Sequence, residues 1–261
     1  REGLASTYSD KNELAVPGYY RVLLDRFGIQ AEMTATKRVA LYNFTFPRGS
    51  NNAGIIIDLE NTVGDNTREA RVAPIDEYTL VGYRRSSGWA SDQHVYFCIR
   101  FSRPMHNWYS AGLDAHYGEA TFELSPGDQV MAKVALSPTS EANAMMNMNQ
   151  EMPGDFDFKA VATAASEAWN EQLSRIKATF RTERERRIFY TAMYHFMVAP
   201  QTWCDISGDY MGADLKIHRG AKYETLTTWS LWDTYRAAHP LATIIMPDRM
   251  PDYAKTMMAI F

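Results

Sequence analysis

Hydrophobic and polar residues alternate in short runs through the first half of the chain, between Tyr19 and Ser137. The runs are rich in β-branched and aromatic residues, and an alternation with a period of two gives a strand one apolar face and one polar face. The connecting segments carry the Pro, Gly and Asn residues that turns require. The expected strands cover residues 19–24, 31–46, 54–59, 78–84, 94–102, 119–124 and 128–136. The pattern predicts an antiparallel β-sandwich.

After Pro138 the hydrophobic spacing changes to three and four residues, which is typical of amphipathic helices. Thr182 with Glu185 three residues later matches a capping box and predicts the start of one helix. Pro200 and Pro240 are expected to end two of the helices. The expected helices cover residues 140–152, 158–176, 182–199, 230–239 and 251–261. So few helices do not close a helical barrel, and a further segment or a partner chain is expected to complete it.

Composition narrows the classes of partner. The chain has 261 residues, a hydrophobic content of 46% and a net charge of −4, with basic residues scattered rather than gathered in a stripe. This distribution argues against nucleic acid and anionic membranes as partners. The sequence contains no apolar run of about 18 residues, so no transmembrane segment is predicted. Cys98 and Cys204 are expected to be two buried thiols, although a pair is arithmetically possible.

The segment from Thr227 to Pro240 concentrates the chemistry of the chain, because two indoles, a carboxylate and a guanidinium lie close together in it. An indole stacks on the apolar face of a pyranose, while charged groups hydrogen-bond its hydroxyls. Trp232, Asp233 and Arg236 are therefore candidate sugar-binding residues. An alternative is structural: Ser230 and Asp233 also match a capping box, so Asp233 is either a helix cap or a ligand contact.

Other motifs carry less information. His218 lies shortly before this segment and is a further candidate ligand contact, the alternative being a packing residue. Asp205, Ser207 and Asp209 resemble a calcium loop, but Tyr210 replaces the expected glycine and a turn with Asx hydrogen bonds fits better. No nucleophile elbow, phosphate loop, dinucleotide fingerprint or zinc spacing occurs in the sequence.

Several motifs resemble those of the glycoside hydrolase family 92 α-mannosidases and follow one another in the same order along the chain. The strongest is Thr-Thr-x-Ser-Leu-Trp-Asp-Thr-x-Arg-Ala-x-His-Pro at residues 227–240. The segments at 205–212, 216–218 and 188–195 agree with it, as do 17–20, 32–39, 88–90 and 133–137 in the first half. The resemblance covers essentially the whole chain.

This resemblance implies a multidomain β-then-α fold, in which an antiparallel β-sandwich is followed by linker helices and the first helices of an incomplete (α/α)6 barrel. The expected division is a sandwich over residues 1–138, linker helices over 139–178 and the start of the catalytic domain over 179–261. The implied activity is calcium-dependent, inverting removal of terminal α-linked mannose from glycans. A periplasmic or secreted location follows only from that role, with any export signal upstream of Arg1.

The resemblance places the general acid, the general base and the calcium ligands beyond Phe261, so no catalytic residue and no metal ligand is predicted in this chain. Trp232 and Asp233 are carried over as mannose contacts, with Arg236 either binding the sugar or orienting Asp233. The expected partners are a mannose-containing glycan and the remainder of the catalytic domain. Two alternatives stay open, namely a non-catalytic carbohydrate-binding or assembly module and another carbohydrate enzyme with an (α/α)6 barrel.

Overall fold

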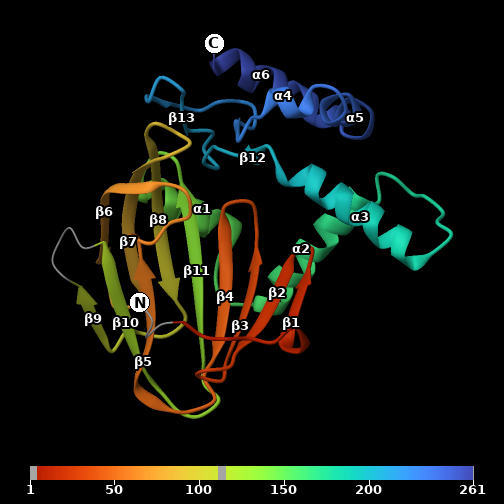
Figure 1. Ribbon diagram of the computed structural model, residues 1–261. Helices are drawn as coiled ribbons and strands as arrows, with labels where there is room; N and C mark the ends of the chain where they lie inside the picture. The colour runs from red at the N-terminus through yellow and green to blue at the C-terminus, as the bar shows by residue number, and fades with distance from the viewer. Residues whose placement is uncertain (1–4, 111–115, 261) are drawn as a thin grey trace. The chain divides into compact units, whose positions relative to one another are not determined.

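The computed structural model describes residues 5–110 and 116–260 and divides the chain into two compact units. The first unit comprises residues 1–165 and consists mainly of strands, and the second comprises residues 166–261 and consists mainly of helices. Figure 1 shows the change from strands to helices along the chain. The predicted fold class, a β-sandwich followed by helices, is therefore confirmed.

The first unit contains two antiparallel sheets. Within the described residues, the larger sheet has the strand order β1-β2-β3-β4-β11-β8-β7-β6 and the smaller one the order β5-β10-β9. A short 3-10 helix, η1 (Asp10–Asn12), precedes β1 and is capped by the Ser9 hydroxyl. The strands are β1 (Glu13–Val16), β2 (Tyr19–Leu24), β3 (Ile29–Ala35), β4 (Val39–Thr45), β5 (Ser50–Asp58), β6 (Asn66–Pro74), β7 (Thr79–Ser87), β8 (Gln93–Phe101), β9 (Asn107–Ser110), β10 (Tyr117–Leu124) and β11 (Gln129–Ser137).

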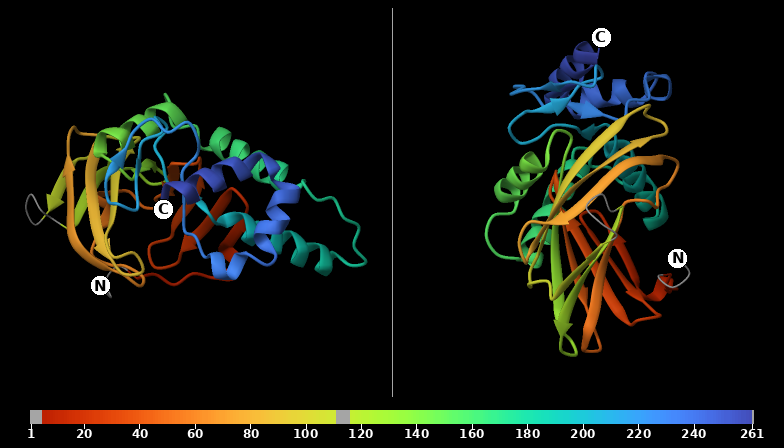
Figure 2. Two further views of the ribbon diagram at one scale, coloured as in Figure 1. Left: turned by 90° about the horizontal axis from the view of Figure 1, so that it is seen from above. Right: turned by 90° about the vertical axis from the view of Figure 1, so that its left-hand side faces the viewer.

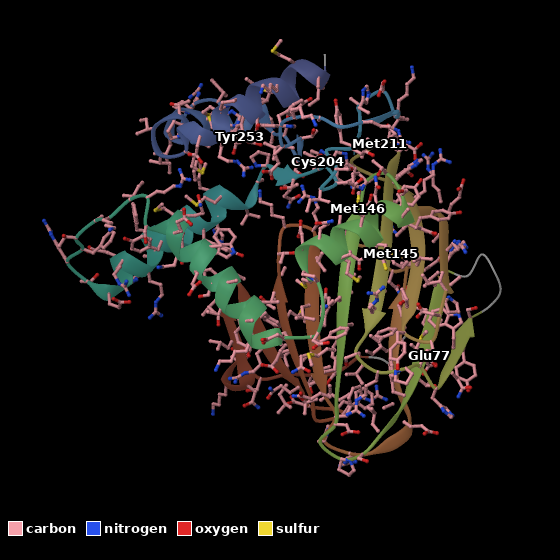
Figure 3. The ribbon with its side chains drawn as sticks, turned by 180° about the vertical axis from the view of Figure 1, so that it is seen from behind. Glu77, Met145, Met146, Cys204, Met211 and Tyr253 are labelled. Atoms are coloured by element: carbon pink, nitrogen blue, oxygen red, sulfur yellow. The ribbon has the colours of Figure 1, made fainter. Side chains whose placement is uncertain are left out.

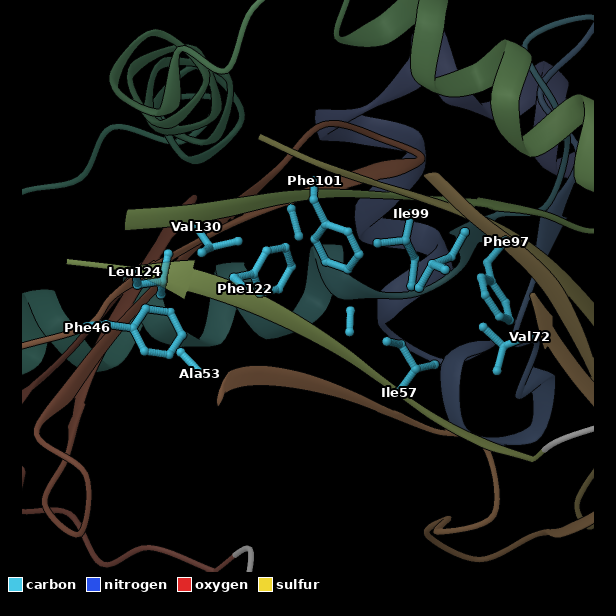
Figure 4. Packing of buried hydrophobic residues seen from close by; sticks show 13 residues of the cluster. Phe46, Ala53, Ile57, Val72, Phe97, Ile99, Phe101, Phe122, Leu124 and Val130 are labelled. Carbon is cyan, nitrogen blue, oxygen red and sulfur yellow. The ribbon is translucent and has the colours of Figure 1, made fainter. Parts of the chain in front are cut away.

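The main core lies between the two sheets. Alternate residues of β8 and β10 point inward, so that the Phe101 and Phe122 rings meet edge to face with their centroids 5.2 Å apart. Figure 4 shows these side chains with Val72, Ile99 and Val130 in one continuous cluster. The alternation read from the sequence is thus the cause of the sandwich, because it supplies each sheet with one apolar face.

A second core lies on the opposite face of the larger sheet, where the helix α1 (Glu141–Glu151) packs. Figure 2 shows α1 lying along this sheet. The Ser140 hydroxyl accepts a hydrogen bond from the Asn143 amide and caps the helix. Ala144 and Met148 of α1 are buried against Leu41 and Cys98 of the strands. The larger sheet is therefore covered on both faces over its central strands.

Lys133 of β11 is a charged side chain in this second core, and it is buried. Its ammonium group donates to the carbonyls of Met152, Gly154 and Asp155 at 2.9, 2.8 and 3.2 Å. It also lies 4.6 Å from the centroid of the Phe156 ring. Burial lowers the pKa of Lys133, whereas three carbonyl acceptors match the three N–H groups of the charged form. Lys133 thereby ties the segment after α1 to the sheet.

The second unit combines helices with four very short strands. The helix α2 (Phe158–Leu173) runs across the boundary between the units. The remaining elements are α3 (Glu183–Val198), β12 (Gln201–Thr202), β13 (Tyr210–Met211), β14 (Ile217–His218), β15 (Leu226–Thr227), α4 (Leu231–Thr234), α5 (Ala238–Ile245), η2 (Pro247–Arg249) and α6 (Met250–Ile260).

Ring contacts hold the last helices of this unit together. The Trp229 ring meets the rings of His239 and Tyr253 edge to face, with centroids 6.0 and 5.2 Å apart. Figure 3 labels Tyr253 on α6. Arg175, just after α2, binds both carboxylate oxygens of Asp248 at 2.8 and 3.1 Å. Trp229 is half-buried and its indole N–H donates to the Leu226 carbonyl, which agrees with the interpretation of this residue as packing.

The strand prediction was wrong in two respects. The run expected at 31–46 is two strands, β3 and β4, because a turn at residues 36–38 reverses the chain without any glycine or proline. The strands β1, β6 and β9 were missed. The strand β6 lies at the edge of the larger sheet and carries Arg68, Glu69 and Arg71 beside its buried Ala70 and Val72, which hides its strand character in the sequence.

The helix expected at 230–239 was also wrong. The structure has two helices there, because α4 ends at Thr234 and α5 begins at Ala238. Pro240 does not end a helix but lies in the first turn of α5. A proline is tolerated at this place because the amide groups of the first turn have no intrahelical acceptor.

Both cysteines are buried thiols that form no disulfide, as expected from the sequence. Burial raises the pKa of Cys98 to about 11, which keeps the thiol protonated at neutral pH. Across residues 5–110 and 116–260, the structure has no helix with the length and apolar character needed to span a bilayer. The division predicted at residues 138 and 178 stays a prediction.

Candidate functional site

The residues singled out in the Trp-Asp segment lie on the short helix α4 and just after it. Trp232 points into solvent, with 83% of its surface exposed. Asp233 and Arg236 are exposed as well. Because burying an indole stabilises a fold, a Trp that stays in solvent does not serve the core of this unit. Trp232 therefore does not have the packing role that Trp229 has.

The capping box at Ser230, which the sequence left open as an alternative, does not form. The Ser230 side chain makes no hydrogen bond to the backbone of α4 and instead donates to Oδ2 of Asp233. The first turn is held by the Ser230 carbonyl, which accepts from the amides of Asp233 and Thr234 at 3.1 and 3.2 Å. The Asp233 carboxylate is thus hydrogen-bonded to the Ser230 side chain rather than to the backbone at the start of the helix. Its Oδ1 accepts from no described residue. This leaves a carboxylate oxygen that can accept from a ligand.

Arg236 does not orient Asp233. Its Nε donates to the Tyr235 hydroxyl at 2.6 Å, and its guanidinium carbon lies 5.4 Å from the centroid of the same ring. The terminal N–H groups of Arg236 have no acceptor among the described residues. The guanidinium is therefore a hydrogen-bond donor at the surface, as a ligand contact would require.

His218 lies on a different element, the hairpin of β13 and β14. Its ring stacks on the Tyr210 ring with centroids 5.1 Å apart and an angle of 14°. Its Nε2 lies 3.0 Å from Oδ1 of Asp214, and this contact lowers the pKa of the Asp214 carboxyl group. The Tyr210 hydroxyl lies 3.4 Å from that of Tyr223, and this contact together with burial raises the pKa of Tyr210 to about 12. His218 is therefore a half-exposed histidine whose ring is held by contacts with Tyr210 and Asp214.

The structure thus places the predicted site residues in two groups. Trp232, Asp233 and Arg236 lie together around α4, whereas His218 belongs to the β13–β14 hairpin. Over the described part of the second unit, no hydrogen bond, ion pair or ring contact joins His218 to the α4 group. Figure 3 labels Met211 at the start of the hairpin turn.

The loop that resembles a calcium site does not fit one. The Asp209 carboxylate is buried and accepts from the Gly220 amide at 2.9 Å and from Arg219 at 3.4 Å. Asp214 is engaged with His218 and the Lys216 amide. Among the described residues, no three His, Cys, Asp or Glu side chains converge as a metal site would need. These carboxylates stabilise turns, which is the interpretation that the sequence favoured.

Sequence reasoning did not single out Trp89, whose side chain is fully exposed in the turn between β7 and β8. Ion pairs lie beside this turn. Arg84 of β7 binds both oxygens of Asp65 at 2.9 and 3.0 Å, and Arg85 of β7 binds both oxygens of Asp92 at 2.7 Å. An indole exposed at a strand connection is a second aromatic candidate for a sugar contact. The signal in the sequence is a Trp between Gly88 and Ala90 at a strand connection, where no core lies.

Comparison with known families gives a match over nearly the whole chain. The family model described as "Glycosyl hydrolase family 92 N-terminal domain" matches residues 1–137, and that described as "Glycosyl hydrolase family 92 catalytic domain" matches residues 143–261. The chain belongs to glycosyl hydrolase family 92.

Solved structures of this family have the same fold. A family GH92 alpha-mannosidase from Bacteroides thetaiotaomicron is 29% identical, with a TM-score of 0.89 over 98% of this chain and 36% of its own. An inverting mannosidase of the family from Bacteroides thetaiotaomicron VPI-5482 is 25% identical, with a TM-score of 0.76 over 91% of this chain and 33% of its own. A curated relative, an uncharacterized secreted glycosidase from Arthroderma benhamiae, is 30% identical over 78% of this chain and 30% of its own length.

This family 92 chain spans about a third of the length of the relatives that it matches. Within that third, the described residues offer a stacking surface, a hydrogen-bond acceptor and a donor at α4. Groups of these kinds can bind and orient a sugar. Glycoside hydrolysis additionally requires two carboxyl groups on opposite sides of the scissile bond.

Proposed function

We propose that this chain forms the N-terminal part of an α-mannosidase that removes terminal α-linked mannose from glycans with inversion of configuration. One observation carries the proposal: the chain belongs to family 92, and a solved alpha-mannosidase of that family matches 98% of it. The solved inverting mannosidase supports the stereochemistry. The exo mode of action follows from the resemblance of the Trp-Asp segment.

In this proposal, the residues around α4 bind the terminal mannose. Trp232 stacks on the apolar face of the pyranose, and the free oxygen of Asp233 accepts from a sugar hydroxyl. The terminal N–H groups of Arg236 donate to ring or hydroxyl oxygens. All three side chains are exposed, so a ligand reaches them without local unfolding.

The bond-breaking groups lie elsewhere in this proposal. In an inverting enzyme, one carboxylic acid protonates the leaving oxygen and a carboxylate about 6.5–9.5 Å away activates water. Both are expected beyond Phe261, together with the ligands of a calcium ion. The described residues do not form a binding site for that ion, and none of the binding roles proposed for the residues around α4 depends on it.

The proposed location is outside the cytoplasm, in the periplasm or the medium. Two points support this location. One is the secreted relative, and the other is the large size of the glycans, which are degraded in the compartment in which the enzyme encounters them. The proposed partners are a mannose-containing glycan and the remaining part of the catalytic domain.

The test is mannose release from an α-1,2-linked mannobiose by the longest natural polypeptide that contains this sequence. NMR of the anomeric proton identifies the anomer of the released mannose. Release of β-mannose from the α-linked substrate would support both the activity and the inversion. Retention of the α-anomer would contradict inversion alone. Mannose binding without release would support the non-catalytic binding module instead.

A further inference from the structure

His218 is held at one face and one edge of its ring, although about half of its side chain is exposed. Tyr210 covers one face of its ring at an angle of 14°, and Asp214 lies 3.0 Å from its Nε2. On the same edge of the ring, Gly212 leaves the space that the imidazole needs. A Cβ atom at Gly212 would lie 2.7 Å from Nε2 and 2.8 Å from Cδ2 of His218, and 2.6 Å from Oδ1 of Asp214.

These contacts determine which nitrogen carries the proton in the neutral ring. An ionised carboxylate only accepts hydrogen bonds, so Nε2 must donate to Asp214. Asp214 is ionised at neutral pH, because His218 and the Lys216 amide lower the pKa of its carboxyl group. The remaining nitrogen, Nδ1, then carries a lone pair. It lies across the ring from Gly212 and has no partner among the described residues.

We propose that Asp214 is a positioning residue which fixes His218 with Nε2 protonated, so that Nδ1 accepts a hydrogen bond from a hydroxyl group of the glycan. Gly212 is part of the same arrangement, because any larger residue there would displace the side chains of Asp214 and His218. The ligand class is a neutral polyol, since a lone pair on Nδ1 recognises a donor and repels an anion. This inference rests on the proposed function for the identity of the substrate.

The charged and titratable groups around the ring are few. Tyr210 lies against its face, Asp214 lies at Nε2, and Lys216 and Tyr223 belong to the same hairpin region. None of these offers a competing donor to Nδ1.

The experiment compares substitutions that imitate one ring nitrogen each. In His218→Asn the amide lies near the position of Nδ1, whereas in His218→Gln it lies near the position of Nε2. The proposal predicts that His218→Gln and Asp214→Ala raise KM for α-1,2-mannobiose about tenfold with kcat within twofold, and that His218→Asn stays within threefold of wild type in KM. A pattern confined to KM is expected because the hydrogen bond forms equally in the ground and transition states.

A matched control is available in the sandwich. His116 and Glu60 also form a half-exposed pair, with Nδ1 2.7 Å from Oε2. Glu60→Gln should leave both KM and kcat unchanged. If Asp214→Ala and His218→Gln behave like Glu60→Gln, or if His218→Asn loses as much as His218→Gln, the positioning role is wrong.

A second readout does not depend on hydrolysis. Methyl α-mannoside should slow the carbethoxylation of His218 by diethyl pyrocarbonate, read by peptide mass spectrometry, and leave that of His116 unchanged. If wild type releases no mannose, the proposed function fails, and this protection then decides the role of His218 by itself. Equal modification with and without the sugar would overturn the inference even in an active enzyme.

Discussion

Asp233 and Lys133 show how the neighbours of a charged side chain decide its role. Lys133 is buried and meets three carbonyl acceptors, so all of its donors are satisfied inside the fold. Asp233 is exposed, and one of its carboxylate oxygens accepts a hydrogen bond from Ser230, which leaves the other oxygen for a ligand. The sequence identified Asp233 as chemically important but left its role open between a cap and a contact. It gave no sign of Lys133, because the acceptors come from a loop about twenty residues later.

Replacing Asp233 by alanine should lower kcat/KM of the intact enzyme for an α-mannoside by about a hundredfold, since a charged hydrogen bond to the substrate is lost. The unfolding midpoint in urea should not change, because Asp233 makes no backbone cap. Glu171→Ala, which removes an exposed carboxylate from α2, is the matched control and should leave kcat/KM unchanged. An Asp233→Ala enzyme with the kinetics of wild type would reduce Asp233 to a surface residue.

Replacing Lys133 by methionine should destabilise the sandwich by about 2 kcal/mol, because three carbonyls lose their donor while the volume is nearly kept. The measurement is urea unfolding followed by near-UV circular dichroism. Lys159→Met, at an exposed position of α2, should change the free energy of unfolding by less than about 0.5 kcal/mol. Equal effects of the two substitutions would mean that the Lys133 contacts add no net stability.

At the scale of elements, the two capping motifs of the sequence had opposite outcomes. At Thr182 the box is complete, with the Glu185 amide donating to the Thr182 hydroxyl at 3.2 Å and the Glu185 carboxylate accepting from the Thr182 amide. At Ser230 the same pattern gives a contact between side chains. The helix that follows Thr182 has 16 residues, whereas α4 has four. A capping motif therefore predicts a helix reliably only where the hydrophobic spacing behind it is long enough to sustain one.

Much of the sandwich was readable from the sequence, because a period of two in a two-sheet core leaves little choice of face. The expected strand at 19–24 coincides with β2, and the expected helix start at Thr182 coincides with that of α3. The edge strand β6 and the turn at 36–38 were not readable. Their character depends on neighbours in space, namely the β7 pairing and the hydrogen bond from the Thr36 amide to the Val39 carbonyl.

The difference between the caps gives a prediction for stability. Thr182→Ala should lower the free energy of unfolding by about 1 kcal/mol, because an amide of the first turn loses its acceptor. Ser230→Ala should lower it by less than about 0.5 kcal/mol, because the Ser230 hydroxyl caps no amide. Thermal or urea unfolding of the two variants measures the contrast. Equal losses would show that Ser230 stabilises α4 in solution after all.

At the scale of the whole molecule, binding groups and bond-breaking groups belong to different parts of the polypeptide in our proposal. The described residues present an exposed indole, a carboxylate oxygen and a guanidinium around α4, but the resemblance places the acid and the base beyond Phe261. Physical reasoning from the sequence proposed the first set by residue type. It could not locate a catalytic pair, because paired carboxylates are recognised by their separation in space rather than along the chain.

This separation predicts that the isolated 261-residue chain releases no mannose, while the intact enzyme does so only with calcium. A sugar that is held in place still needs a proton for its leaving oxygen and an activated water, and neither comes from Trp232, Asp233 or Arg236. In the intact enzyme, chelation should abolish release from α-1,2-mannobiose, and added calcium but not added magnesium should restore it, because a flexible site of many oxygen ligands would suit the larger ion. Release by the isolated chain would mean that an acid and a base lie within these residues. Full activity of the chelated enzyme would exclude the calcium ion and leave the rest of the proposal standing.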